Sequence, residues 1–246
     1  MIMIIGASHD DILYFDSVLS HKRSEIVFQK YEIKFGKIFN QDIMLVEGAY
    51  TNSISSALAL YLMDKYYVIL TFIVGKCASF SKNFKIGEIA ISRKAYFGAV
   101  NFGNGGDARL GQVPDFPTVY ESPRDVIGYL RNALEQRTST RYHRCKFISF
   151  DRELHRRDEL DYIRSGETIF GDEERTVIDT NTAGVALACY ILKVPFVSVK
   201  VVERLLDEES SIENYYKVLT QYTDLGKAMI TCIGDIGRTD ILTEVE

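Results

Sequence analysis

The chain has 246 residues, of which 46% are hydrophobic and 26% charged, and its formal net charge at neutral pH is -5. This composition is typical of a folded globular protein with a sizeable core, and it excludes a disordered chain. A nucleic-acid-binding surface usually carries an excess of basic residues, so the acidic balance argues against a nucleic-acid partner.

The first third of the chain alternates short apolar runs with helical patterns. A buried strand at the N-terminus precedes a helix that begins after Ser8, where the acidic first turn suits the helix dipole. The run 68–74 is typical of a strand buried on both faces, and we expect it to end at Gly75 in a polar ligand loop. The predicted strands cover residues 1–5, 25–28, 31–39, 43–46, 68–74 and 84–92, and a helix covers residues 52–65.

The rest of the chain keeps the same alternation after one irregular segment. Residues 101–117 are rich in Gly and Pro and predict a long loop, and loops of this length are usually functional or flexible. The predicted helices cover residues 122–137, 158–164, 181–192 and 212–233, and the predicted strands 145–149, 176–179 and 194–202. These elements predict a single α/β domain over residues 1–236, followed by a loosely held tail over 237–246.

Several absences limit the class of protein. Four scattered cysteines have neither metal-ligand nor CxxC spacing, so we expect small core side chains, no metal site and no cofactor. No N-terminal signal pattern is present, and no apolar run approaches the ~20 residues of a membrane span. We therefore expect a cytoplasmic protein that has no membrane contact.

The order of short motifs resembles the nucleoside phosphorylase superfamily, and within it the 5′-methylthioadenosine/S-adenosylhomocysteine nucleosidases. The matching segments are Ile4–Ala7 before an acidic helix start, Gly75–Ser79 with Phe84–Ser92, Leu110–Pro114, and Val194–Val199. The resemblance implies a twisted mixed sheet, partly barrel-like and flanked by helices. It also implies a homodimer, in which the apolar residues Leu110, Val113 and Phe116 of the long loop reach the partner subunit.

The resemblance assigns roles to three carboxylate or amide positions. Cleavage of an N-glycosidic bond passes through a sugar with oxocarbenium character, and it requires an activated water and a protonated leaving base. Asp11 falls where the family keeps its water-activating Glu, although plain helix-start charge explains it equally well. Asn181 falls on the position of the family's ribose-binding Glu, and Asp179 falls on a neighbouring family position. A role as helix N-cap explains Asn181 equally well.

The position of the family's purine-protonating Asp is occupied by Arg204. Arginine cannot deliver a proton near neutral pH, so Glu203 would have to serve instead. Uridine phosphorylases also carry an Arg near this point, which keeps a changed base preference open, and a fixed cation should prefer carbonyl acceptors or an anion. Arg204 could instead point to solvent or pair with an acid of its own loop.

Two further observations concern phosphate. The arginines with which phosphorylases of this superfamily hold phosphate are missing after the first strand and before Gly75, which favours hydrolysis over phosphorolysis. Lys76 replaces a small residue of the ligand loop, and it is either an anion ligand or a solvated charge.

The leading hypothesis is a divergent nucleosidase that hydrolyses a small-molecule nucleoside. The alternatives are an inactive homologue that binds a nucleoside-like ligand and a phosphorylase with an altered base preference. The candidate catalytic residues are Asp11, Glu203 and Arg204. The candidate substrate-binding residues are Ala7, Lys76, Cys77, Ala78, Leu154, Asp179, Thr180, Asn181 and Lys200.

Overall fold

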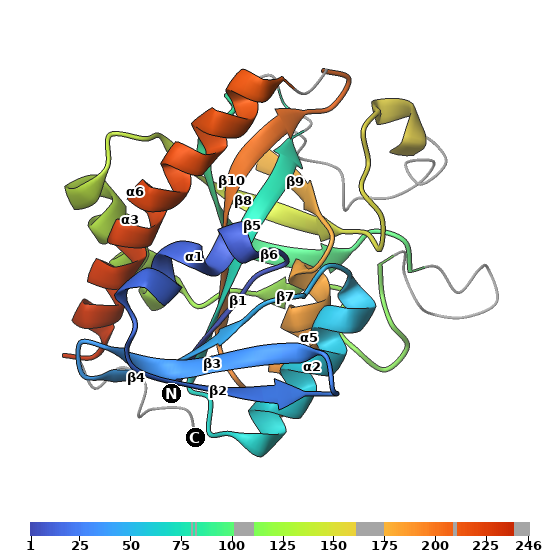
Figure 1. The fold of residues 1–246 in the computed structure, drawn as a ribbon. Helices are drawn as coiled ribbons and strands as arrows, with labels where there is room; N and C mark the ends of the chain where they lie inside the picture. Colours follow the sequence, from blue (N-terminus) through green and yellow to red (C-terminus); the bar gives the residue numbers. More distant parts are fainter. Residues whose placement is uncertain (80, 82, 101–110, 161–174, 209–210, 239–246) are drawn as a thin grey trace.

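The computed structural model describes residues 1–79, 81, 83–100, 111–160, 175–208 and 211–238 (Figure 1). The strands are β1 (Ile2–Ile5), β2 (Ser20–Val27), β3 (Tyr31–Ile38), β4 (Gln41–Val46), β5 (Leu70–Ser79), β6 (Ile89–Phe97), β7 (Tyr120–Glu121), β8 (Tyr142–Ser149), β9 (Thr176–Asp179) and β10 (Phe196–Leu205). The helices are α1 (His9–Val18), α2 (Asn52–Lys65), α3 (Arg124–Arg137), the 3₁₀ turn η1 (Arg157–Leu160), α5 (Thr182–Leu192) and α6 (Ile212–Ile236).

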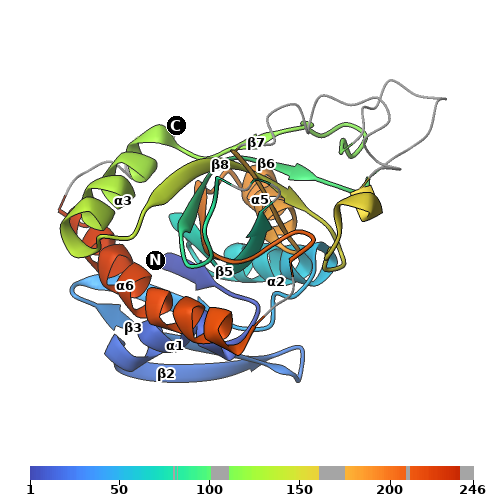
Figure 2. The same ribbon diagram turned by 90° about the horizontal axis from the view of Figure 1, so that it is seen from above.

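All these strands belong to one mixed sheet that partly closes on itself. Its order is β10-β6-β8-β9-β5-β1-β4-β3-β2, with β7 on β6, and β10 also pairs with β5. The second pairing of β10 closes a ring through β5, β9, β8, β6 and β10, which Figure 2 shows from above. The expected single α/β domain with a partly barrel-like mixed sheet is therefore confirmed.

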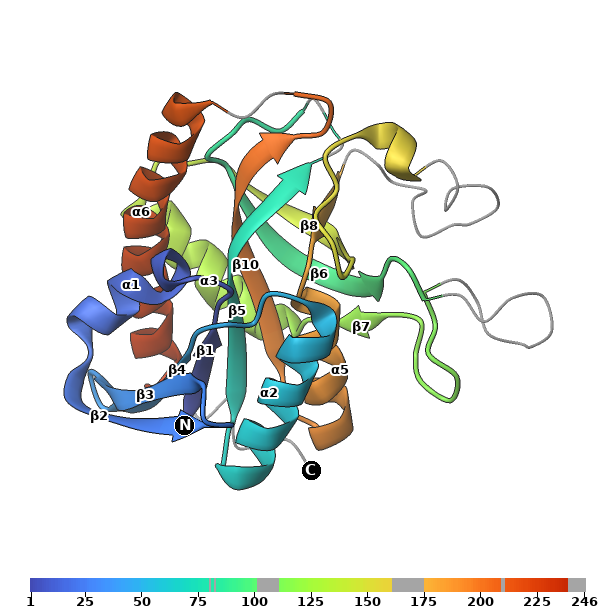
Figure 3. The ribbon, with the colours of Figure 1, turned by 45° about the vertical axis from the view of Figure 1, so that its right-hand side comes forward.

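Strand β5 is the hub of this sheet. Along one edge it pairs with β10 from Thr71 to Ser79, and the strands run together in Figure 3. Along its other edge, β5 pairs with β1 as far as Ile73 of β5, and it pairs with β9 only from Ala78 of β5 onward. The short stretch between them has no strand partner on that edge. Such a break beyond the carboxyl end of a parallel strand is where open α/β sheets place ligands.

Helices cover both faces of the sheet. Helices α1, α3 and α6 pack over a core of Ile2, Ile4, Phe72 and their neighbours, whereas α2 and α5 pack over a core that includes Met3, Ile5 and Ile73. The two sets lie on opposite sides in Figures 1 and 2. Successive residues of β1 and β5 thus enter different cores, which explains their continuous apolar runs.

Several boundaries differ from the sequence expectation. Strand β5 does not end at Gly75, because β10 continues to pair with it as far as Ser79. Residues 85–88 form a turn with Gly87 at φ +93°, so the next strand starts only at Ile89. The pattern analysis missed β7, which has only 2 residues.

Other predictions fall wholly or partly outside the described residues. These are residues 101–110 of the long loop, including Leu110, residues 161–164 of a predicted helix, and residues 239–246 of the tail. Among the described residues no helix is both long and apolar enough to cross a membrane.

Candidate active site

A cavity of about 350 Å³ lies at the break beside β5, within the usual size range of small-molecule sites. Its walls come from the turn between β1 and α1, from β5, from the start of α5, from the end of β10 and from the segment after β8. All twelve residues proposed from the sequence line it: Ala7, Asp11, Lys76, Cys77, Ala78, Leu154, Asp179, Thr180, Asn181, Lys200, Glu203 and Arg204. The fold therefore brings them together, while their individual roles stay predictions.

Asp11 is held rigidly at one wall of this cavity. Its Oδ2 accepts hydrogen bonds from the backbone N–H of Ala7 at 2.9 Å and of Ser8 at 2.8 Å, and its Oδ1 accepts one from the Tyr222 hydroxyl at 2.7 Å. Two carboxylate oxygens offer about four acceptor sites, so one remains for a ligand or a water. Burial, helped by the adjacent Asp11, raises the pKa of Tyr222 well above its usual value, which keeps this hydroxyl a donor.

Gly75 allows β5 to pass close to Asp11. Its φ is +141°, and a Cβ at this position would lie 3.2 Å from Asp11 Oδ2. A side chain would be strained there by both conformation and contact. The segment after Gly75, which was expected to be a polar loop, is therefore part of strand β5 and lines the cavity, while its role in ligand binding stays a prediction.

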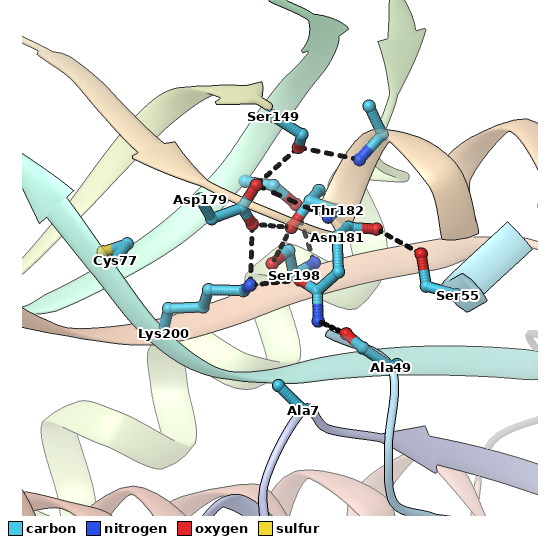
Figure 4. Close-up of polar contacts among 12 residues, drawn as sticks. Ala7, Ala49, Ser55, Cys77, Ser149, Asp179, Asn181, Thr182, Ser198 and Lys200 are labelled. Carbon is cyan, nitrogen blue, oxygen red and sulfur yellow. Dashed lines mark hydrogen bonds and ion pairs between the residues drawn. The ribbon is translucent and has the colours of Figure 1, made fainter. Parts of the chain in front are cut away.

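A buried polar cluster forms another part of the cavity wall (Figure 4). Lys200 Nζ lies 2.7 Å from Asp179 Oδ2 and donates to Asn181 Oδ1 at 2.5 Å. The side chains of Lys200 and Asp179 are only 3% and 1% exposed. The Asp179 carboxylate also accepts hydrogen bonds from Ser149 Oγ and Thr182 Oγ1. These contacts occupy most acceptor sites of the Asp179 carboxylate, and its expected place beside ribose stays a prediction.

Asn181 is the N-cap of α5 by position, but it makes no side-chain cap bond. Its Oδ1 accepts from Lys200 and its Nδ2 donates to the Ala49 carbonyl at 2.6 Å. These contacts fix which end of the amide is the donor, and they leave one Nδ2–H for a ligand. The helix-cap interpretation is therefore incomplete, because the side chain links α5 to β10 and to the segment before α2.

A β-bulge shapes the wall that β10 contributes. The pairing of β10 with β5 shifts register between Val202 and Arg204, so Glu203 is the extra residue. In a regular strand neighbouring side chains point to opposite faces, whereas at this bulge both Glu203 and Arg204 line the cavity. Burial raises the pKa of Glu203, while the nearby cations Lys76 and Arg204 oppose the rise.

Arg204 is 9% exposed. Its Nη1 donates to Glu153 Oε2 at 3.3 Å, but its buried Nε has no hydrogen-bond partner. The expectation that Arg204 points to solvent is therefore wrong, as is its pairing with an acid of its own loop. Its ionic partner is Glu153, 51 positions earlier in the chain.

Lys76 and Cys77 also line the cavity. Lys76 Nζ lies 6.0 Å from the centre of the Tyr215 ring, and its charge acts on Glu203. Cys77 is 2% exposed, and burial raises the pKa of its thiol well above the usual value. A thiol so far from ionisation is a packing group rather than a nucleophile.

Sequence reasoning missed several lining residues. Ser8 was interpreted only as a helix start, yet its buried Oγ has no hydrogen-bond partner. The basic, polar residues 152–157 suggest a solvated face, yet Arg152 and Glu153 line the cavity. Tyr222, on the apolar face of the last predicted helix, does not line the cavity but donates to Asp11, which does. Nothing in the local sequence indicates that these segments meet. Within the described residues, no three His, Cys, Asp or Glu side chains are placed to hold a metal ion.

Comparison with known proteins agrees with this fold. The phosphorylase superfamily model matches residues 1–231. The chain belongs to this superfamily. It is 25% identical over 229 residues to a 5′-methylthioadenosine/S-adenosylhomocysteine nucleosidase of Staphylococcus carnosus, which covers 86% of this chain and 90% of that relative. It is 21% identical over 209 residues to the nucleosidase of the same name from Exiguobacterium, which covers 85% and 87%.

Solved structures of other proteins share the fold. The nucleosidase of this type from Neisseria meningitidis, in complex with methylthio-immucillin-A, has a TM-score of 0.85 at 18% identity and covers 95% of this chain and 98% of that one. A futalosine hydrolase of Helicobacter pylori has a TM-score of 0.82 at 14% identity and covers 95% and 97%. Hydrolases of different names thus share this architecture, so residues of the cavity must decide the substrate.

Proposed function

We propose that the protein hydrolyses the N-glycosidic bond of a nucleoside, as a divergent relative of the methylthioadenosine/adenosylhomocysteine nucleosidases. The observation that carries the proposal is the pair of acidic side chains in one cavity. Asp11 is fixed by three hydrogen bonds, and burial raises the pKa of Glu203. The first suits a base that acts on water, and the second suits an acid that acts on the leaving group.

The reaction needs only groups of this chain and a water molecule. The C1′–N bond breaks, and its electron pair stays with the base, which takes a proton from the Glu203 carboxyl group. The water oxygen bonds to C1′, and its proton passes to the Asp11 carboxylate. Exchange with solvent then restores both side chains. Such acid–base assistance contributes roughly 10²–10⁴-fold in rate.

The sugar would lie between these two acids. Ser8 Oγ, which is buried and unpartnered, and the remaining Nδ2–H of Asn181 are the groups that we assign to the ribose hydroxyls. Asp179 and Lys200 position Asn181 instead of touching the substrate, since they are satisfied by one another and by their neighbours. Lys76, at the same cavity, supports Glu203 electrostatically.

The cellular compartment and the assembly of the protein are also part of what we propose. We place it in the cytoplasm, which the buried thiols of Cys77, Cys189 and Cys232 support, because such thiols persist in a reducing compartment. We propose a homodimer without a nucleic-acid partner. A hollow of about 1030 Å³, lined in part by Phe116, Tyr190 and Ile191, supports a self-contact near the long loop.

The direct test is release of free base from a panel of purine and pyrimidine nucleosides. The wild-type protein should release base, and Asp11→Asn should release it roughly 10²–10⁴ times more slowly. Asp10→Asn is the matched control, because Asp10 lies in the same helical turn but outside the cavity. If wild-type protein binds nucleosides but releases no base, it is an inactive homologue that binds a nucleoside-like ligand, and the proposal is wrong.

A further inference from the structure

In the described part of the chain, two buried polar side-chain atoms without a hydrogen-bond partner belong to residues that line the cavity. Among the described residues, four buried side-chain atoms lack a hydrogen-bond partner, and two of these, Ser8 Oγ and Arg204 Nε, belong to residues that line this cavity. An unsatisfied buried donor destabilises the folded protein. A bound ligand that supplies an acceptor would remove this destabilisation at Arg204.

The guanidinium group of Arg204 has one edge engaged and one edge free. Nη1 on one side donates to Glu153. The N–H of Nε points in nearly the same direction as one N–H of Nη2, so together they form a fork that matches two adjacent acceptors. Among the described residues no group accepts from Nε, so this edge of the guanidinium is left unpaired.

Purine bases present two adjacent groups of this kind at the edge formed by position 6 and N7. In a 6-oxopurine both O6 and N7 are acceptors, and the bidentate match with arginine is the commonest specific contact of that edge. In a 6-aminopurine N7 accepts, but the amino group is a donor. An arginine facing this edge would then place one of its N–H donors against the N–H donor of the amino group.

We propose that Arg204 selects a nucleoside whose base is a 6-oxopurine, and that it binds O6 and N7 with its free edge. This inference rests on the proposed hydrolytic function and adds the class of base. A uracil nucleoside offers single carbonyl acceptors without an adjacent ring acceptor, so it uses only half of the fork. The fixed positive charge also stabilises the electrons that the departing base retains when C1′–N9 breaks.

The test compares nucleosides with the same sugar that differ only in the base. Wild-type protein should cleave the 6-oxopurine nucleoside about 10 to 100 times more efficiently, in kcat/KM, than the 6-aminopurine nucleoside. Arg204→Lys keeps the charge but loses the fork, so most of this preference should disappear. Arg204→Asp should reverse the preference, because a carboxylate accepts from the amino group.

Two controls separate base reading from a structural role of Arg204. Glu153→Gln removes the ion pair but keeps the guanidinium, so the ratio between the two nucleosides should stay near the wild-type value. Arg131→Lys makes the same substitution on the exposed face of α3, where Arg131 pairs with Glu135, and should leave the ratio unchanged. If Glu153→Gln abolishes the preference as fully as Arg204→Lys, Arg204 acts only as a tether and the inference is wrong.

Failure of the inference differs from failure of the proposed function. Hydrolysis that prefers the 6-aminopurine or a pyrimidine nucleoside overturns the inference and leaves hydrolysis standing. If no nucleoside is cleaved, calorimetric binding of the free bases decides. Tighter binding of hypoxanthine than of adenine, lost in Arg204→Lys, supports the reading of the base, whereas equal or reversed binding contradicts it.

Discussion

The bulge in β10 turns Glu203 into the cavity beside Arg204, and neither this bulge nor the burial of Glu203 could be expected from the sequence. Burial raises the pKa of Glu203 above the ordinary value of 4.5. The folded protein therefore holds a proton on Glu203 at pH values where the unfolded chain has lost it. Its contribution to the free energy of unfolding is full below about pH 4.5 and is lost as the pH rises through the folded-state pKa.

Glu203→Gln removes this titration while keeping the shape of the side chain. We expect the melting temperature of the variant, relative to wild type, to be higher at pH 8 than at pH 4. Thermal unfolding across this range measures the difference, and Glu32→Gln, at an exposed position of β3, should show none. A pH-independent difference for Glu203→Gln would mean that the carboxyl group is not desolvated in the folded protein.

Lys200 is the second residue with a clear energetic prediction. Lys200→Met leaves the buried charge of Asp179 without its ionic partner, which should cost about 3–5 kcal/mol of stability. Adding Asp179→Asn in the same chain removes that charge and should recover much of the loss. Chemical denaturation of the single and double variants measures the coupling. If the free-energy changes of the two single variants add up to that of the double variant, Lys200 and Asp179 do not stabilise the protein as a coupled pair.

At the scale of elements, strand β5 depends on the glycine that lets it pass close to Asp11 of α1. Gly75→Ala places a Cβ 3.2 Å from Asp11 Oδ2 at a φ of +141°, so we expect a loss of about 1–3 kcal/mol. Gly128→Ala is the matched control, since nothing lies within 4 Å of its Cβ position in α3. That substitution should be stabilising by about 0.5–1 kcal/mol, because alanine suits a helix interior better. Denaturant midpoints give both values, and a neutral Gly75→Ala would contradict the close approach of β5 to Asp11.

The element order could be predicted from the sequence far better than the contacts within the cavity. Continuous buried runs locate β1 and β9, helical periodicity locates α2 and α6, and the short motifs indicate which turns meet at the cavity. The bond from Tyr222 to Asp11 joins residues 211 positions apart. The bulge at Glu203 arises from pairing with β5. Neither leaves a local pattern, so neither could be predicted from the sequence alone.

At the scale of the whole molecule, the surface around the long loop predicts self-association. Tyr190 is 52% and Ile191 43% exposed, and they lie beside the described end of that loop. We expect a dimer by light scattering at micromolar concentration. Ile191→Asp should weaken it, whereas Leu13→Asp, at an exposed site on α1, should not. A wild-type monomer at that concentration would contradict the proposal.

The central claim is that this cavity splits a nucleoside with water. The most direct measurement is the sugar product formed in phosphate-free buffer and in buffer with excess phosphate. Hydrolysis predicts free sugar and free base in equal amounts, at the same rate in both buffers. A sugar 1-phosphate that appears only with phosphate, or no cleavage in either buffer, would contradict the account.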